Sequence, residues 1–161
     1  MRLIRRFVPL TLLLVLAAAS PAFADATLFI GSTTTPANRT ARGFALGVGL
    51  LIVGFEFEYS DTKEDPAEQA PSLRTGMGNV LLQTPFPIAG LQFYATTGGG
   101  VFRETLGTEQ ETQFGVNAGG GVKISLLGPL RARLDYRVFN LRGEPLHPTV
   151  HRLYAGLNLK F

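Results

Sequence analysis

The sequence predicts an all-β protein, an eight-stranded antiparallel up-and-down β-barrel preceded by a cleavable signal peptide. Three observations predict this fold. Segments of about ten residues with strand character recur, short and long connections alternate between them, and apolar and polar residues alternate within them. No apolar stretch reaches the roughly 20 residues that a membrane-spanning helix needs, and no long segment keeps a helical period.

The first 24 residues have the composition of a secretory signal peptide. A positive start, Arg2 to Arg6, is followed by an apolar run over 7–19 and by the small-residue triplet Ala22-Phe23-Ala24. Because the run is too short to anchor the chain as a membrane helix, we expect cleavage between Ala24 and Asp25. The predicted organisation is a signal peptide over 1–24 and one barrel domain over 25–161.

The formal charge of the mature chain differs from that of the precursor. The precursor has 15 Lys and Arg against 12 Asp and Glu, and its signal segment carries three arginines and no acid. Removing that segment leaves a neutral chain, so the basic isoelectric point does not indicate a nucleic-acid partner. The chain has no cysteine, which excludes disulfides and thiolate chemistry. We expect no cofactor, and a closed sheet would supply the stability that disulfides give other exported domains.

Turn signals and alternation delimit eight segments within the barrel domain. We expect strands over 26–32, 42–49, 52–60, 74–84, 91–103, 113–125, 130–139 and 150–161. Short connections fall near 50–51, where no residue typical of a turn occurs, at 85–90 and at 126–129. The longer polar connections are 33–41, 61–73, 104–112 and 140–149. In a membrane barrel, short turns face the periplasm, longer loops face outside, and an even strand count places both termini on the periplasmic side.

The segment 130–139 indicates which face of the sheet lines the lumen. Its apolar residues alternate with four charged ones, Arg131, Arg133, Asp135 and Arg137. Each charge would cost about 2–4 kcal/mol near the middle of a bilayer, so this face must point into the barrel. A soluble barrel would show the opposite arrangement, with apolar side chains inside. The parity therefore favours a transmembrane β-barrel.

The same parity assigns the faces of other strands. It directs Glu56 and Glu58 into the lumen and the aromatic residues between and beside them toward lipid. The outward aromatic residues of this segment are Phe55, Phe57 and Tyr59. In the sixth segment the parity places Gln113, Asn117 and Lys123 inside, and Phe114, Val116, Ala118, Val122 and Ile124 outside.

These assignments predict an ion network across the lumen. The third and seventh strands of an eight-stranded barrel lie opposite one another, and the heights of their charged residues overlap. Buried charges are retained only when they are paired and hydrogen-bonded. We predict that the network joins Glu56 and Glu58 to arginines among Arg131, Arg133 and Arg137, with Asp135 as the neighbouring acid. Such a network should plug the barrel.

The last nine residues alternate without a break. Leu153, Ala155, Leu157, Leu159 and Phe161 point one way, and Arg152, Tyr154, Gly156, Asn158 and Lys160 point the other. With its signal peptide, eight strands and terminal Phe161, the chain resembles the small OmpA/OmpX-like outer-membrane β-barrel family over nearly the whole mature length. The resemblance implies the outer membrane of a Gram-negative-type bacterium and contact with outer-membrane lipid. It also implies that the assembly machinery reads Leu157, Leu159 and Phe161 as a C-terminal insertion signal.

Three other patterns could carry chemistry. Gly98-Gly99-Gly100 and Gly119-Gly120-Gly121 would need a following helix to bind phosphate, and none follows, so we interpret them as room for bulky lumen side chains. His147 and His151 stand about 13 Å apart on an extended segment, which is too far to share a metal ion. The acidic stretch 61–68 lacks the ordered ligands of a calcium loop and is interpreted as a solvated loop.

One enzymatic alternative stays open. Some eight-stranded barrels modify lipid A with a serine, a histidine and an acid near the outer rim, and His151 could serve as the base. Its available partners in the sequence are Ser60, Ser72, Thr149, Glu111 and Glu144, none of which lies in a recognisable motif.

The predicted function is structural or interaction-based rather than enzymatic. Eight strands enclose an interior that side chains fill, so a wide diffusion pore is not expected. The alternatives are the lipid-modifying enzyme and a narrow or gated channel. The sequence identifies no partner for the extracellular loops.

Overall fold

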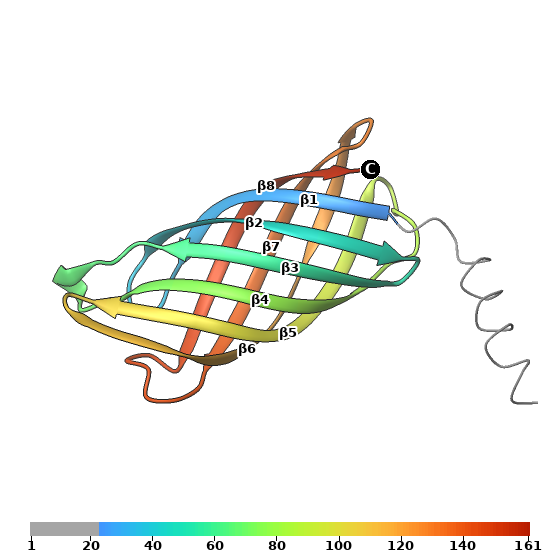
Figure 1. Ribbon diagram of the computed structural model, residues 1–161. Helices are drawn as coiled ribbons and strands as arrows, with labels where there is room; N and C mark the ends of the chain where they lie inside the picture. The colour runs from blue at the N-terminus through green and yellow to red at the C-terminus, as the bar shows by residue number, and fades with distance from the viewer. Residues whose placement is uncertain (1–22) are drawn as a thin grey trace, which may run out of the picture.

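The computed structural model describes residues 23–161, which form one closed barrel. Each strand is hydrogen-bonded antiparallel to the next, and the eighth closes on the first (Figure 1). The strands are β1 (Phe23–Thr33), β2 (Arg39–Leu50), β3 (Val53–Thr62), β4 (Ser72–Gln83), β5 (Leu91–Leu106), β6 (Glu109–Leu127), β7 (Leu130–Leu141) and β8 (Thr149–Lys160). The predicted fold class is confirmed. No helix in this part of the chain is long and apolar enough to span a membrane.

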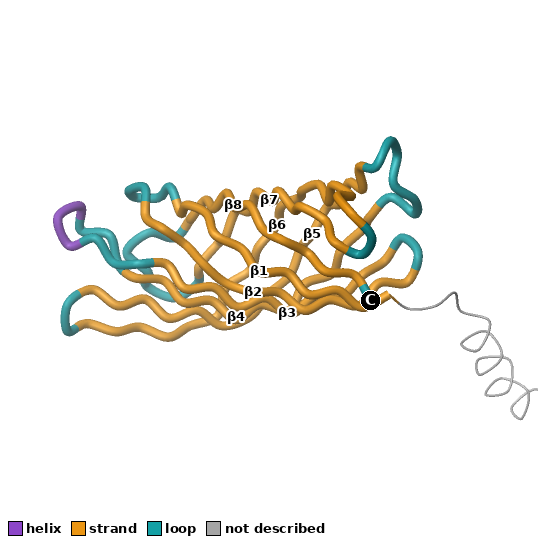
Figure 2. Tube along the Cα trace, turned by 90° about the horizontal axis from the view of Figure 1, so that it is seen from above, coloured by secondary structure: helices purple, strands orange, loops and turns teal. Residues whose placement is uncertain are grey.

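The expected signal peptide lies outside the described residues except for Phe23 and Ala24, which begin β1. Ala24 exchanges two backbone hydrogen bonds with Phe161, at 3.0 and 2.9 Å. The C-terminus therefore lies at the same end of the barrel as the start of β1, opposite the short helix η1 (Pro66–Glu68) (Figure 2). We call these the short-turn end and the loop end.

The turn between β2 and β3 forms without a turn-type residue. Leu51 takes the left-handed conformation, with φ at 51°, which a β-branched or bulky residue seldom adopts. The neighbouring strand stabilises the turn from the side. Gln83 donates its side-chain Nε2 to the carbonyl of Leu51 at 3.3 Å and its backbone N–H to the carbonyl of Ile52 at 2.8 Å. Hydrogen bonds from Gln83, a residue distant in the chain, therefore stabilise a turn that the local sequence does not indicate.

One predicted loop is wrong. The segment 104–112 is a long hairpin rather than a polar connection, because β5 and β6 pair continuously up to Leu106 and Glu109. Gly107, at φ +61°, makes the turn, and its N–H donates to the Glu64 carboxylate at 2.9 Å. The polar composition indicated a loop, but polar side chains suit a strand that continues beyond the apolar band of the barrel.

The two faces of the sheet differ as the parity predicts. Along β3 buried and exposed residues alternate, with Glu56 and Glu58 buried and the aromatic residues exposed. On the outer face Phe44 lies 6.4 Å from Phe57 and 5.8 Å from Tyr59 between ring centres. Other large apolar residues exposed on this face include Leu28, Ile30, Leu46, Leu134, Leu153 and Leu157. The outside of the barrel is therefore an apolar band.

The lumen is not charged along its whole length. Toward the loop end, an apolar cluster fills it, formed by Leu73, Met77, Phe102, Phe139, Leu141 and Val150. Phe139 and Leu141 continue the inward parity of Arg137 on β7, so the strand changes from charged to apolar without changing face. The expectation of a charged lumen therefore holds nearer the short-turn end. The apolar cluster interrupts the charged lining, and buried charged residues recur at the loop end, where Arg39 and Glu104 lie.

The outward assignment of β7 predicts a depth-dependent cost for a charge. Leu134, 46% exposed midway along the apolar side of β7, should lose about 2–4 kcal/mol of unfolding free energy in lipid vesicles when changed to Arg. Leu127→Arg, at a residue 82% exposed at the short-turn end, should cost about 0–1 kcal/mol. Denaturant titration of both variants measures the difference. Equal costs would show that Leu134 does not face hydrocarbon.

Candidate functional site

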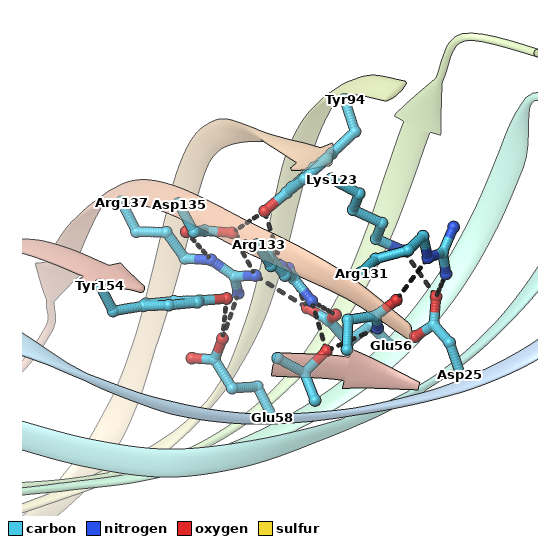
Figure 3. Close-up of polar contacts among 12 residues, drawn as sticks. Asp25, Glu56, Glu58, Tyr94, Lys123, Arg131, Arg133, Asp135, Arg137 and Tyr154 are labelled. Carbon is cyan, nitrogen blue, oxygen red and sulfur yellow. Dashed lines mark hydrogen bonds and ion pairs between the residues drawn. The ribbon is translucent and has the colours of Figure 1, made fainter. Parts of the chain in front are cut away.

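The charged part of the lumen is the candidate site, and two opposite strands supply most of it. β3 contributes Glu56 and Glu58, and β7 contributes Arg133, Asp135 and Arg137 (Figure 3). These side chains meet across the lumen because strand alternation points them all inward. Both arginine side chains are 0% exposed, so neither can exchange its partners for water.

Glu56 lies between the two arginines. Its carboxylate accepts hydrogen bonds from Arg133 through both terminal nitrogens, that from Nη2 at 3.2 Å, and from Arg137 Nη2 at 2.8 Å. Asp135 receives the same two cations from the other side, with Arg133 Nη2 at 3.0 Å and Arg137 Nε at 2.9 Å. Two guanidinium groups and two carboxylates thus form one hydrogen-bonded cluster.

Glu58 extends this cluster toward β8. It forms ion pairs with Arg137 Nη1 at 3.1 Å and with Arg152, whose Nη1 also donates to Ser60. Arg152 is buried and was missing from the predicted network. The alternation in the last strand had already assigned Arg152 to the polar face. The sequence did not indicate that Arg152 lies at the same height in the barrel as Glu58.

Arg131 does not join Glu56 or Glu58. It lies nearer the short-turn end, where its Nη2 is 3.2 Å from Asp25 and its Nε donates to Asn158 at 2.8 Å. Lys123 reaches the same Asp25 carboxylate at 2.6 Å. The structure therefore separates a second cluster, Asp25 with Lys123 and Arg131, from the network of Glu56, Glu58, Arg133, Asp135, Arg137 and Arg152.

The second cluster lines a cavity of about 530 Å³ at the short-turn end. Lys160 and Gln92 also line it, and Gln92 accepts a hydrogen bond from Arg131 at 3.0 Å. Open space in the lumen therefore lies between the network and the short-turn end of the barrel.

Aromatic rings hold the buried guanidinium groups from the side. The Tyr94 hydroxyl donates to Asp135 and accepts from Arg133 Nε at 2.7 Å, and the Arg133 guanidinium lies 4.8 Å from the ring centre. Arg152 lies 4.5 Å from the Phe139 ring centre, where the charge network meets the apolar cluster. Cation–π contacts of this kind gain strength when the cation is desolvated.

Glycines opposite these rings provide the room. A Cβ on Gly121 would lie 2.4 Å from the Tyr94 hydroxyl oxygen, and one on Gly119 would lie 3.0 Å from Arg137 Cγ. The first contact is closer than real Cβ atoms come, and a Cβ on Gly119 would also lie 2.2 Å from the Tyr136 carbonyl oxygen, so the triplet Gly119-Gly120-Gly121 is needed where large lumen residues cross. The structure supports this interpretation, since both glycine triplets lie inside strands.

The residues of the enzymatic alternative do not meet. His151 lies on the outer face of β8, where its Nδ1 and the Tyr136 hydroxyl share a hydrogen bond of 2.7 Å. Ser60 is buried in the lumen, on the other side of the barrel wall, and bonds to Thr75 and Arg152. Ser72 donates to the Thr105 carbonyl at 3.3 Å, and the Glu111 carboxylate accepts the N–H of Glu144. Thr149 begins β8 and is exposed.

The two histidines lie in different parts of the β7–β8 region. His147 belongs to the connection before β8, while His151 lies within the strand. Within residues 23–161 no group of three or more His, Cys, Asp or Glu side chains could hold a metal ion.

Fold and lumen together define a small, closed, eight-stranded barrel that is apolar outside and filled inside. Solved structures of this class resemble it. The N-terminal β-barrel domain of Pseudomonas aeruginosa OprF superposes with a TM-score of 0.66 and 14% identity, over 88% of this chain and 100% of that one. Neisserial surface protein A, NspA, superposes with a TM-score of 0.66 and 17% identity, over 87% of this chain and 96% of that one. PagL, described as an outer membrane enzyme, superposes with a TM-score of 0.52 and 12% identity, over 84% of this chain and 98% of that one.

At these identities the likeness shows the fold, which is that of the small outer-membrane barrels the sequence resembles. No protein-family model matches the chain, and no curated protein matches its sequence. The compared structures include an enzyme beside a surface protein, so the activity must be argued from the residues themselves.

The network predicts strong coupling between Glu58 and Arg152. Breaking one partner of a buried pair leaves an uncompensated charge, so Glu58→Gln and Arg152→Gln should each cost about 3–5 kcal/mol of unfolding free energy. The double variant should cost less than their sum by about 0.5–3 kcal/mol. Denaturant unfolding in detergent micelles measures the cycle.

The exposed pair Arg42–Asp61, at 3.7 Å on the outer face, is the matched control. The same cycle there, with Arg42→Gln and Asp61→Asn, should give a coupling of about 0–1 kcal/mol. Additive losses at Glu58 and Arg152 would mean that their contact contributes no stability.

Proposed function

We propose that this protein is a small outer-membrane barrel with a structural or surface-interaction role and that its lumen is closed to ions. The filling of the lumen in two layers supports this most directly. The network around Arg133 and Arg137 occupies one level, and the apolar cluster around Phe102 and Phe139 occupies the next. An ion passing through would have to displace both layers.

The loop end supports a role at the surface. Carboxylates there accept backbone N–H groups from other connections: Glu64 from Gly107 at 2.9 Å, Glu111 from Glu144 at 3.2 Å and Glu104 from Leu146 at 3.3 Å. Arg39 links two further connections, since it donates to the Thr35 and Pro71 carbonyls. Contacts of this kind order the connections into one surface, which a binding partner would meet preformed.

Conductance in planar bilayers tests the closed lumen. The wild-type barrel should give no discrete current steps. Glu56→Gln with Glu58→Gln leaves arginines unpaired, and together with Phe102→Ala and Phe139→Ala, which open the apolar layer, these changes should give an anion-selective leak. Asp61→Asn removes an acid from the same strand on the outer face and should leave the barrel closed. Steady conductance of the wild type would favour the channel alternative.

The proposal includes export and assembly, for which the sequence is the support. We propose that the mature chain begins at Asp25 and that the apolar stripe of Leu157 and Leu159 on β8 and of the following Phe161 is an insertion signal. N-terminal sequencing of protein from the outer-membrane fraction tests the first part. Full-length protein in the inner membrane would contradict it.

Phe161→Ala tests the second part. The side chain is 67% exposed, so its loss should cost about 1–3 kcal/mol at most in the folded barrel, while assembly in cells should fall far more steeply. Phe86→Ala, at a residue 71% exposed in the β4–β5 connection, is the control and should assemble normally. Heat-dependent gel mobility reports the folded fraction in both. Equal effects in cells and in micelles would reduce Phe161 to a packing residue.

A further inference from the structure

A row of side chains crosses the outer face of the barrel near the loop end. Its members are direct cross-strand partners from β2 to β6: Arg42 pairs with Asp61, Asp61 with Arg74, Arg74 with Arg103, and Arg103 with Thr112. We call these five residues the arginine row. None of them takes part in the lumen network.

The arginine row has more positive than negative charge. Asp61 is its single carboxylate and already accepts Arg74 Nε at 3.0 Å and lies 3.7 Å from Arg42. Arg103 turns the other way and donates its Nε to the Thr112 hydroxyl at 3.1 Å. Arg74 and Arg103 are nevertheless directly opposite on neighbouring strands, an arrangement that repels unless an anion lies between the two guanidinium groups.

A groove of about 340 Å³ lies between these two arginines on the outer face. Gly76 lines it, and Gly78 is the next outward-facing residue of β4 toward the short-turn end. A Cβ on Gly76 would meet only Val101 Cγ2, at 3.9 Å, and one on Gly78 only the Gly99 carbonyl oxygen, at 3.9 Å. No packing or turn within the barrel requires these two glycines, in contrast to Gly119 and Gly121.

Apolar side chains wall the groove below the arginines. Tyr59 and Phe57 of β3 are the cross-strand partners of Gly76 and Gly78 and stand on one side. Val101 stands on the other side, and the Phe114 ring covers Gly99, the partner of Gly78. The cationic end of the groove therefore lies next to the apolar side chains of the outer band.

We propose that this groove binds a phosphate-bearing lipid of the surrounding leaflet. Arg74 and Arg103 hold the phosphate, since the guanidinium fork matches phosphate oxygens in pairs. One acyl chain lies over Gly76 and Gly78. The arginine row lies where the apolar outer band ends. The aromatic residues Phe44 and Tyr59 lie on its short-turn side, and the polar residues Thr40 and Lys63 lie on its loop side. This boundary is the level of the lipid headgroups. The inference rests on the proposed membrane location.

Binding of phosphatidic acid to the barrel in neutral detergent micelles tests the proposal, with retained lipid counted by native mass spectrometry. Arg74→Gln with Arg103→Gln should weaken binding by about tenfold or more, because both charge-assisted contacts to the phosphate are lost. Gly76→Leu, which fills the floor and leaves both arginines in place, should weaken it similarly. Arg42→Gln removes an arginine of the same row outside this groove and should bind within about twofold of wild type.

Two further arms separate the possible occupants. Diacylglycerol, which lacks the phosphate, and inorganic phosphate, which lacks the chains, should each bind at least about tenfold more weakly than phosphatidic acid. Inorganic phosphate or dextran sulfate that displaces phosphatidic acid completely would identify a soluble anion as the occupant and overturn the proposal, as would unchanged binding by Gly76→Leu.

Each variant is first shown to be a closed barrel by its heat-dependent gel mobility. All the substituted side chains lie on the outer face, so closure is expected. Failure of the wild type to fold in micelles would count against the proposed membrane function, whereas a folded wild type without preference for phosphatidic acid would count against the lipid site alone.

Discussion

Pairing of the buried positive charge on β7 is the constraint on which the lumen depends. Arg137 contacts Glu56, Glu58 and Asp135, so a single guanidinium group joins β3 to β7 across the barrel. An arginine at this depth without such partners would cost several kcal/mol. The height of β3 relative to β7 is therefore fixed from inside, in addition to the hydrogen bonds between neighbouring strands.

The need to pair these buried charges also determines where the barrel wall has glycines instead of larger residues. Large cations and aromatic rings that cross a narrow lumen need wall positions without side chains, and Gly119 and Gly121 supply them opposite Arg137 and Tyr94. In the next layer toward the loop end, Phe102 and Phe139 fill the space by apolar packing. Arg152, stacked on Phe139 and paired with Glu58, connects the two regions.

Alternation in the sequence predicted which face each side chain occupies but not its height. Face follows from parity alone, which is why Glu56, Glu58, Arg133 and Arg137 could be expected to meet. Height depends on strand tilt and stagger around the whole barrel, which no single segment encodes. Arg131 was therefore grouped with the wrong acids and Arg152 was not included. Composition misled in one further place, the β5–β6 hairpin, because polar residues are typical both of loops and of strands beyond the apolar band.

The two charged regions of the barrel differ in whether the protein itself completes them. Inside, each carboxylate of the network is shared between cations, and every cation reaches at least one carboxylate, so the arrangement is self-sufficient. Outside, Arg74 and Arg103 are cross-strand partners with Asp61 already engaged by Arg74, beside a glycine floor that nothing in the barrel fills. Buried charge is tolerated only when neutralised within the fold, whereas charge at a membrane boundary can be neutralised by the surroundings. The inner network is therefore neutralised by the protein itself, whereas the proposed site at Arg74 and Arg103 takes its counter-charge from a lipid phosphate.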